Sequence, residues 1–178
     1  LAGGGALHAD CEAALLEAFA KISPESELRL VFIGPVKDQR YFEGLQETAR
    51  RLNLSERIRF FGNRDDAPRL LAGADLALMP SLSEGFGIAA LEAMAVGTPV
   101  LAAVEEGPGD FIDDGNTGLA IDPRDPEDIA AKIEVLLRDN TMYRRIAAEA
   151  KALVQEKYLW PVVVARTAGL YRQLLRDR

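Results

Sequence analysis

The sequence predicts an α/β fold, in which a parallel sheet carries helices on both of its faces. Short, mostly apolar runs alternate with amphipathic stretches of helical period along the chain. Several of these runs end in glycine, proline or serine, as strands do where they meet a loop. Because strands that alternate with helices run parallel and are buried from both sides, we expect one domain that spans residues 1–178.

The positions of the expected elements follow from the periodicity of apolar residues, from glycines at the ends of helices and strands, and from helix-capping residues. Helices are expected at residues 10–22, 40–52, 67–72 and 87–97, and strands at residues 28–33, 58–61, 75–79, 100–104 and 119–121. The run Asp125-Pro126-Glu127-Asp128 starts another helix, since it offers an N-cap aspartate, a proline at the first position and acids in the first turn. Two or three helices then fill the rest of the chain.

The two ends of the chain carry separate expectations. The opening Leu1-Ala-Gly-Gly-Gly-Ala is a poor start for a fold, so we expect either a piece of a longer protein or an engineered start. Residues 160–178 are expected to form a long helix with one apolar stripe, and such a stripe needs a partner surface. The stripe consists of Val163, Val164, Thr167, Leu170, Tyr171 and Leu174.

The composition excludes several classes of function. With 48% hydrophobic residues the chain can bury a core, and its net charge of −7 argues against a nucleic-acid partner. Cys11 is the one cysteine, so no disulfide can form within the chain, and the single histidine, His8, rules out histidine-rich metal sites. No apolar run approaches the roughly 18 residues of a membrane span, and no signal peptide is visible. We therefore expect a cytoplasmic protein.

The segment from Glu84 to Glu92 is the most informative part of the sequence. It follows a short apolar strand and runs into the helix expected at residues 87–97. Two glycines, Gly85 and Gly87, let a ligand approach the backbone closely, and the free N–H groups at the helix start form an anion site. These N–H groups belong to Gly87, Ile88 and Ala89. A phosphate there, with a carboxylate on either side to accept hydroxyl hydrogen bonds, describes a sugar nucleotide.

Other interpretations of the acidic and glycine-rich segments are open. Gly85-Phe-Gly-Ile-Ala-Ala fits the dinucleotide fingerprint, with Glu105 twenty residues beyond Gly85, although residues 81–84 separate the glycines from the preceding strand. Asp65-Asp66 resembles a metal-binding pair but suits a helix cap better, since Ala-Pro follows it. Residues 105–110 face the same edge of the sheet, either as a binding loop or as a plain turn.

These residues together resemble a known family of enzymes. Glu84-Gly-Phe-Gly, Leu91-Glu-Ala-Met-Ala and Gly97-Thr-Pro-Val, with seven residues between the two glutamates, look like the signature of retaining glycosyltransferases. Those enzymes have two Rossmann-like domains, the GT-B architecture of glycosyltransferase group 1, family 4. Further matching stretches are Phe32-Ile-Gly, Arg59-Phe-Phe-Gly, Asp75-Leu-Ala-Leu-Met-Pro-Ser, Gly115-Asn-Thr-Gly and Leu170-Tyr-Arg-Gln-Leu-Leu. The resemblance covers nearly the whole chain and matches the C-terminal, donor-binding half of such enzymes.

The resemblance implies a role for each residue of the segment. Glu84 would be the catalytic residue that holds hydroxyls of the transferred sugar, and Glu92 would bind the ribose of the nucleotide. The backbone of residues 85–89 would bind the sugar and the diphosphate. Gly34, Phe61 and Gly62, at the ends of the strands expected at residues 28–33 and 58–61, would border the base. The expected donor-binding residues are Gly34, Phe61, Gly62, Gly85, Phe86, Gly87, Ile88, Ala89 and Glu92.

The resemblance also implies a reaction. The full enzyme would transfer a hexose from a nucleoside diphosphate sugar, of UDP or GDP for example, to an acceptor hydroxyl with retention of configuration. No metal and no cofactor besides the donor are expected, because helix N–H groups and basic residues stabilise the leaving diphosphate. The acceptor, a saccharide, a lipid or a small molecule, would bind through an N-terminal domain that this sequence lacks, and residues 160–178 would pack toward that domain. The full-length enzyme could associate peripherally with a membrane.

One feature departs from the family pattern. The family places a Gly-Arg pair and then a Lys-Gly pair just before the first helix, and these cations neutralise the diphosphate. In this chain the arginine and lysine positions fall near Gly5 and Asp10, and neither residue is basic. An isolated or degenerate module that binds a sugar nucleotide without chemistry is therefore the second hypothesis, and an NAD(P)-binding domain is the third.

Overall fold

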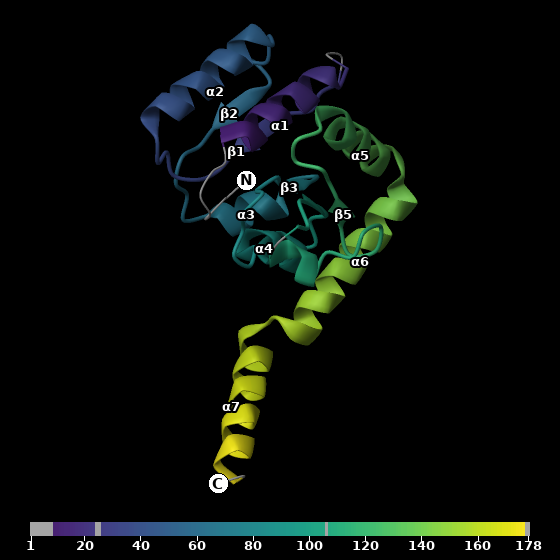
Figure 1. Ribbon diagram of the computed structural model, residues 1–178. Helices are drawn as coiled ribbons and strands as arrows, with labels where there is room; N and C mark the ends of the chain where they lie inside the picture. Colours follow the sequence, from purple (N-terminus) through teal and green to yellow (C-terminus); the bar gives the residue numbers. More distant parts are fainter. Residues whose placement is uncertain (1–8, 24–25, 106, 177–178) are drawn as a thin grey trace.

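The computed structural model describes residues 9–23, 26–105 and 107–176, and the strands in these residues pair in parallel (Figure 1). Hydrogen bonds between the described strands form two sheets, β1–β2 and β3–β4–β5. The strands are β1 (Leu30–Phe32), β2 (Ile58–Phe60), β3 (Ala77–Met79), β4 (Val100–Ala102) and β5 (Leu119–Ala120). The predicted parallel α/β arrangement is confirmed. Each strand is shorter than its apolar run, because regular pairing stops where the chain turns toward the next helix.

The helices lie close to their predicted places. They are α1 (Ala9–Lys21), α2 (Gln39–Arg51), α3 (Ala67–Ala72), α4 (Ile88–Val96), α5 (Pro126–Arg138), α6 (Asn140–Lys157) and α7 (Trp160–Arg176), with a 3₁₀ turn, η1, at Gly107–Asp110. The carboxylate of Asp125 accepts the N–H of Glu127, which confirms the predicted cap of α5. Gly87 and Gly97, both in the left-handed conformation, flank α4 and set its two ends.

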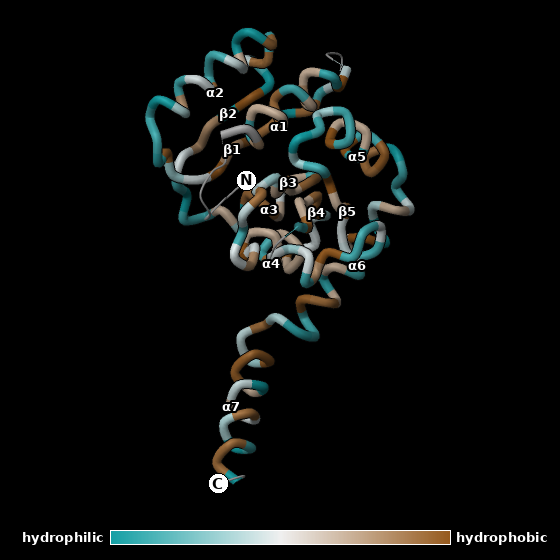
Figure 2. The backbone as a smooth tube through the Cα atoms, in the orientation of Figure 1, coloured by the Kyte–Doolittle hydropathy of each residue, from teal (hydrophilic) through white to brown (hydrophobic). Residues whose placement is uncertain are grey.

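Neighbouring strand residues alternate between two cores, one on each face of the β3–β4–β5 sheet. Leu78 and Leu101 join the core that α1 and α5 cover. Ala77, Met79 and Val100 point the other way, into the core with α4 and α6. The prediction that helices bury the sheet on both faces is therefore confirmed. Figure 2 shows apolar residues along the strands and hydrophilic residues over much of α2.

The last helix, α7, projects away from the rest of the domain (Figure 1). None of its residues is buried. The apolar stripe predicted for residues 160–178 is therefore open to solvent in the described part, 160–176, and Trp160 at the helix start is 79% exposed. Among the described residues, no helix is long and apolar enough to cross a membrane.

Candidate functional site

The candidate site is built around the start of α4. Gly87 precedes the helix with a φ of +82°, a conformation that favours glycine. The N–H groups of Ala90 and Leu91 donate to the Gly87 carbonyl, over 3.0 and 3.2 Å. The N–H groups of Ile88 and Ala89 precede these bonds and have no earlier carbonyl within the helix to pair with. The helix start thus has the free donors that an anion site requires.

The two glutamates of the segment occupy different surroundings. Glu84 lies in the loop before α4 and is half-buried, whereas Glu92 lies on the helix and is exposed. Ile88, which is 65% exposed, precedes Glu92 by four residues and so shares its helical face. Neither carboxylate forms an ion pair with another described residue. Both can therefore accept hydrogen bonds from the hydroxyl groups of a ligand.

The turn η1 supports the glycine loop, by which we mean residues 84–87. A Cβ atom on Gly107 would collide with the carbonyl oxygen of Glu84. A Cβ atom on Gly87 would lie 3.0 Å from the side chain of Pro108 and 3.2 Å from that of Phe111. From the sequence, residues 105–110 were expected to be either a binding loop or a plain turn. In the structure, Gly107 and Pro108 pack closely against the glycine loop and so restrict its path.

Three aromatic rings tie the glycine loop to the end of α6. Phe86 packs edge-on against Phe111 with 5.8 Å between ring centroids, and its ring lies 6.0 Å from that of Tyr158. Phe111 and Tyr158 are also 5.8 Å apart. Aromatic pairs of this kind contribute about 0.5–1.5 kcal/mol each beyond the area that they bury. The family resemblance implied only a backbone role for Phe86. The side-chain cluster was not predicted, because nothing in the sequence links the three positions.

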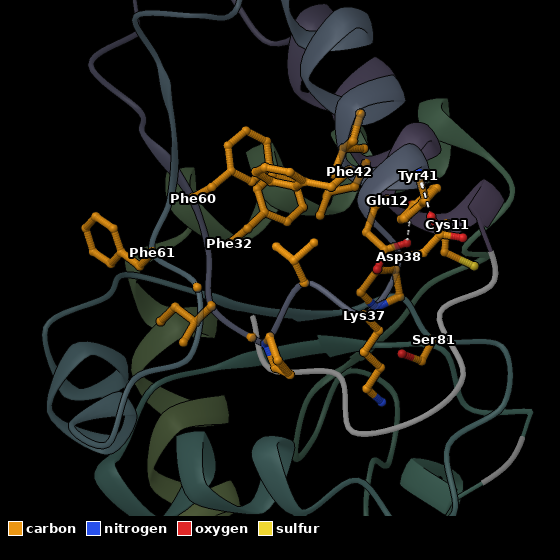
Figure 3. Close-up of a pocket in the computed structure, with 18 of the residues that line it drawn as sticks. Cys11, Glu12, Phe32, Lys37, Asp38, Tyr41, Phe42, Phe60, Phe61 and Ser81 are labelled. Carbon is orange, nitrogen blue, oxygen red and sulfur yellow. Dashed lines mark hydrogen bonds between the residues drawn. The ribbon is translucent and has the colours of Figure 1, made fainter.

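A second group of predicted residues lies where β1, β2 and β3 end. The N–H of Gly34 donates to the carbonyl of Gly62 over 2.9 Å, so the two glycines expected to border the base are neighbours. Together with Phe61 they line a cavity of about 400 Å³ (Figure 3), a size typical of small-molecule sites. None of residues 84–92 lines this cavity. The predicted site residues therefore form two groups, one at this cavity and one at the start of α4. The loop that follows β3 connects them, because Ser81 lines the cavity and residues 84–87 lead into α4.

The cavity also brings together side chains that sequence analysis did not single out. The hydroxyl of Tyr41 on α2 donates to the carboxylate of Glu12 on α1 over 2.7 Å (Figure 3). Lys37, in the loop after β1, and Ser81, in the loop after β3, border the same cavity. A signal was available for Lys37, because residues that follow a strand of a parallel sheet lie at the edge where ligands bind.

Two acidic segments with alternative interpretations have partners within the protein. Two nitrogens of Arg64 contact the carboxylate of Asp66 at 2.7 and 2.8 Å, and these hydrogen bonds lower the pKa of Asp66. Asp66 occupies the expected cap position of α3, but its side chain makes no capping hydrogen bond. Glu105 pairs with Arg124 at 3.4 Å, which argues against a role in holding a dinucleotide ribose. The described residues contain no cluster of three or more acidic, histidine or cysteine side chains that could hold a metal ion.

Comparison with known proteins decides which family shares this arrangement. Residues 13–153 match the family of glycosyl transferases group 1. The chain belongs to this family. The predicted resemblance to the C-terminal domain of a GT-B glycosyltransferase, with its Rossmann-like fold, is thereby confirmed.

The chain spans less than half the length of the first two relatives below, and most of an isolated C-terminal domain. An N-acetyl-alpha-D-glucosaminyl L-malate synthase from Bacillus anthracis is 31% identical over 92% of this chain and 42% of the relative. Anabaena Alr3699/HepE, solved in complex with UDP and glucose, has a TM-score of 0.89 and 26% identity over 97% of this chain and 47% of that one. The C-terminal domain of LpcC from Francisella tularensis has a TM-score of 0.76 and 26% identity, and the match covers 85% of this chain and 81% of that one.

Proposed function

We propose that this chain binds the nucleotide-sugar donor of a retaining glycosyltransferase that transfers a hexose to an acceptor hydroxyl. The observation that carries the proposal is the start of α4, where free N–H groups occur between two carboxylates that have no ion-pair partner among the described residues. A diphosphate accepts hydrogen bonds at a helix start, and sugar and ribose hydroxyls donate to carboxylates. The complexes of Anabaena Alr3699/HepE with UDP and with UDP-glucose support the same class of ligand.

Each group of residues has one task in this proposal. Glu84, held against η1, positions the transferred sugar, and Glu92 binds the ribose. The backbone of residues 85–89 binds the sugar and the diphosphate, and Gly34 with the Phe61-Gly62 pair borders the base. Hydrogen bonds to a charged carboxylate contribute roughly 1.5–3 kcal/mol each, so two such bonds to a vicinal diol suffice for specific recognition.

The proposed reaction needs no metal ion. The start of α4 supplies positive electrostatic potential where negative charge develops on the departing diphosphate.

Residues 1–178 form the donor domain, and the exposed stripe of α7 packs toward an N-terminal domain that binds the acceptor, a saccharide, a lipid or a small molecule. We place the enzyme in the cytoplasm, with peripheral membrane association where the acceptor is a lipid. UDP is the first donor nucleotide to test and GDP the second.

A donor-binding module without catalysis is the second candidate, favoured by the missing cations. The family's arginine and lysine positions fall near Gly5 and Asp10. Gly5 lies outside the described residues, and of Asp10 the structure describes the helical backbone. Removing one such electrostatic partner costs on the order of 3 kcal/mol of transition-state stabilisation. Transfer activity recovered by Gly5→Arg with Asp10→Lys, in a fusion to the N-terminal domain of a relative, would support the enzyme, and continued inactivity would support the module.

Calorimetric titration of the chain tests donor binding itself. UDP, GDP and ADP are each titrated with and without their hexose at low salt. Binding of one nucleotide well above the other two supports the proposal and identifies the class of donor. The absence of binding for all three would contradict a donor site in this chain.

A further inference from the structure

The glycine loop has a single side chain between its two glycines, that of Phe86. Neither Gly85 nor Gly87 carries a side chain that could pack on the domain. A Cβ atom at Gly85 would meet nothing within 4 Å, so the space beside the loop is open there. The ring of Phe86 is therefore the side chain through which the rest of the domain can hold the middle of the loop.

Tyr158 contacts that ring from the end of α6. The centroids of the Phe86 and Tyr158 rings lie 6.0 Å apart, and each ring also lies 5.8 Å from Phe111. Phe111 is 3% exposed and belongs to the core, whereas Phe86 is 42% exposed. The contact between Phe86 and Tyr158 thus lies at the edge of the core. Without it, Phe86 would keep one ring partner among the described residues.

The helix α6 gives Tyr158 a fixed position. The backbone N–H of Tyr158 donates to the carbonyl of Val154 over 2.9 Å at the end of the helix. Val154 and Ala150 are buried in the same core as Ala90 and Met94 of α4, and Tyr158 packs against that core. The Tyr158 ring therefore links the closely packed part of the domain to the loop.

The proposed donor contacts divide between these two parts of the structure. Glu92, assigned to the ribose, lies on α4, whose Leu91 and Met94 are buried in the core. Glu84, assigned to the transferred sugar, lies in the glycine loop ahead of the helix. A change that loosens only the loop should therefore weaken the sugar contacts and leave the ribose contact in place.

We propose that Tyr158 is a positioning residue that raises the affinity for the sugar-bearing donor relative to the free nucleoside diphosphate. This inference rests on the proposed function and adds to it a residue outside the segment 84–92. By holding Phe86, the Tyr158 ring keeps the loop in the conformation in which Glu84 and the loop N–H groups bind the sugar. A loop that is already ordered binds more tightly than a mobile one, because ordering it on binding costs conformational entropy.

Calorimetry on variants of the 178-residue chain tests the proposal. The ligand pairs are UDP with UDP-glucose, GDP with GDP-mannose and ADP with ADP-glucose, and the pair that the parent chain binds best is used for the variants. The measured quantity is the ratio of the affinity for the sugar-bearing form to that for the free nucleotide. In Tyr158→Ala we expect this ratio to fall about fivefold or more, because two ring contacts are lost. The affinity for the free nucleotide should be nearly unchanged.

Three further variants serve as controls. Tyr158→Phe keeps the ring and should keep the ratio of the parent chain. Tyr143→Ala removes another ring from α6, one that packs against the core on the other face of the sheet and whose hydroxyl donates to the carbonyl of Asp75 over 3.0 Å. It should also keep the parent ratio. Tyr158→Leu retains apolar volume without a ring and takes the place of Tyr158→Ala where that variant does not fold.

Three results would overturn the proposal. One is a ratio in Tyr158→Ala equal to that of the parent chain. Another is an equal fall in Tyr158→Phe, which would mean that the hydroxyl group contacts the ligand directly. The third is an equal fall in Tyr143→Ala, which would assign the effect to a general loss of packing along α6. A parent chain that binds none of the nucleotides would overturn the proposed function and this inference with it, so the parent titration separates the two failures.

Discussion

Gly107 lies against the carbonyl oxygen of Glu84, so closely that no Cβ atom fits between them. This contact fixes the loop that carries the proposed sugar-binding carboxylate. Gly107→Ala combines the collision with a φ of +26°, and we expect a loss of about 1–3 kcal/mol in the free energy of unfolding. Denaturant titration measures the loss. Gly85→Ala is the matched control, because a Cβ at Gly85 meets nothing within 4 Å and should leave stability unchanged. Equal losses in both variants would contradict this account.

Gly85→Ala should still affect donor binding. If a ligand approaches the backbone at Gly85, a methyl group there takes the place of the ligand, and affinity for the nucleotide sugar should fall about tenfold while the fold stays intact. Calorimetry on the folded variant measures the affinity. An unchanged affinity would place the ligand elsewhere along the loop.

The two glutamates should separate nucleotide binding from sugar recognition. Glu92→Ala is expected to weaken binding of the preferred nucleoside diphosphate about tenfold or more, because the charged contact to the ribose is lost. Glu84→Ala should leave that affinity nearly unchanged and remove the preference for the sugar-bearing form. Titrations of both variants with the two ligand forms check the division of roles. If the variants behave alike, that division is wrong.

Tyr158 should control the mobility of the glycine loop from the end of α6. Tyr158→Ala removes two ring contacts, those to Phe86 and Phe111, and should speed amide exchange in residues 84–87 several-fold. Tyr158→Phe keeps the ring and serves as the control. Loop exchange that is the same in both variants would mean that the ring contacts do not hold the loop.

Thr98 shows what the Gly-Thr-Pro sequence after α4 does. Its buried hydroxyl donates to the carbonyl of Leu71 over 2.7 Å, which ties the end of α4 to α3. Thr98→Val removes this hydrogen bond, while the carbonyl of Leu71 still accepts the N–H of Ala74 over 3.0 Å. We therefore expect a loss of about 0.5–1.5 kcal/mol in the free energy of unfolding. Thr98→Ser keeps the hydroxyl and should lose less. A larger loss for serine than for valine would show that packing, rather than the hydrogen bond, matters there.

The Arg64–Asp66 pair should make a small part of the stability depend on pH. The hydrogen bonds from Arg64 hold the pKa of Asp66 below its usual 3.8, so the folded state favours the ionised form. The stabilisation is present above the unfolded pKa of Asp66 and is lost as the pH falls through its lower folded value. Arg64→Met should therefore reduce the free energy of unfolding at neutral pH, and the difference from the parent chain should vanish in strong acid. A difference that persists in acid would assign the effect of Arg64 to its packing on Phe61.

Local signals made much of the fold predictable from sequence. The Asp125-Pro126 start of α5 and the Gly87 and Gly97 ends of α4 depend on capping chemistry within a few residues, and the structure has them where they were expected. The separation of the β1–β2 pair from the other strands was not predicted, because strand pairing depends on contacts between distant segments.

In the candidate site, too, features within one short segment were predictable and contacts between distant segments were not. Glu84, Glu92 and the glycines between them share one short segment with a recognisable spacing, so they could be proposed from sequence. The packing of Tyr158 on Phe86 joins positions that lie far apart in the chain and carry no common pattern. The pairing of Arg64 with Asp66 replaced an expected capping contact, because a nearby guanidinium offers the carboxylate two charged donors where the helix start offers neutral N–H groups.

The free-standing helix α7 gives the isolated chain an unusual shape in solution. Its 17 residues extend about 25 Å, and none of them is buried against the body. A compact body with a rod attached experiences more friction than a sphere of the same 19.4 kDa mass. The chain should therefore sediment slowly for its mass and tumble faster about the rod axis than across it. Amide relaxation rates along α7 should differ from those of the sheet for this reason alone.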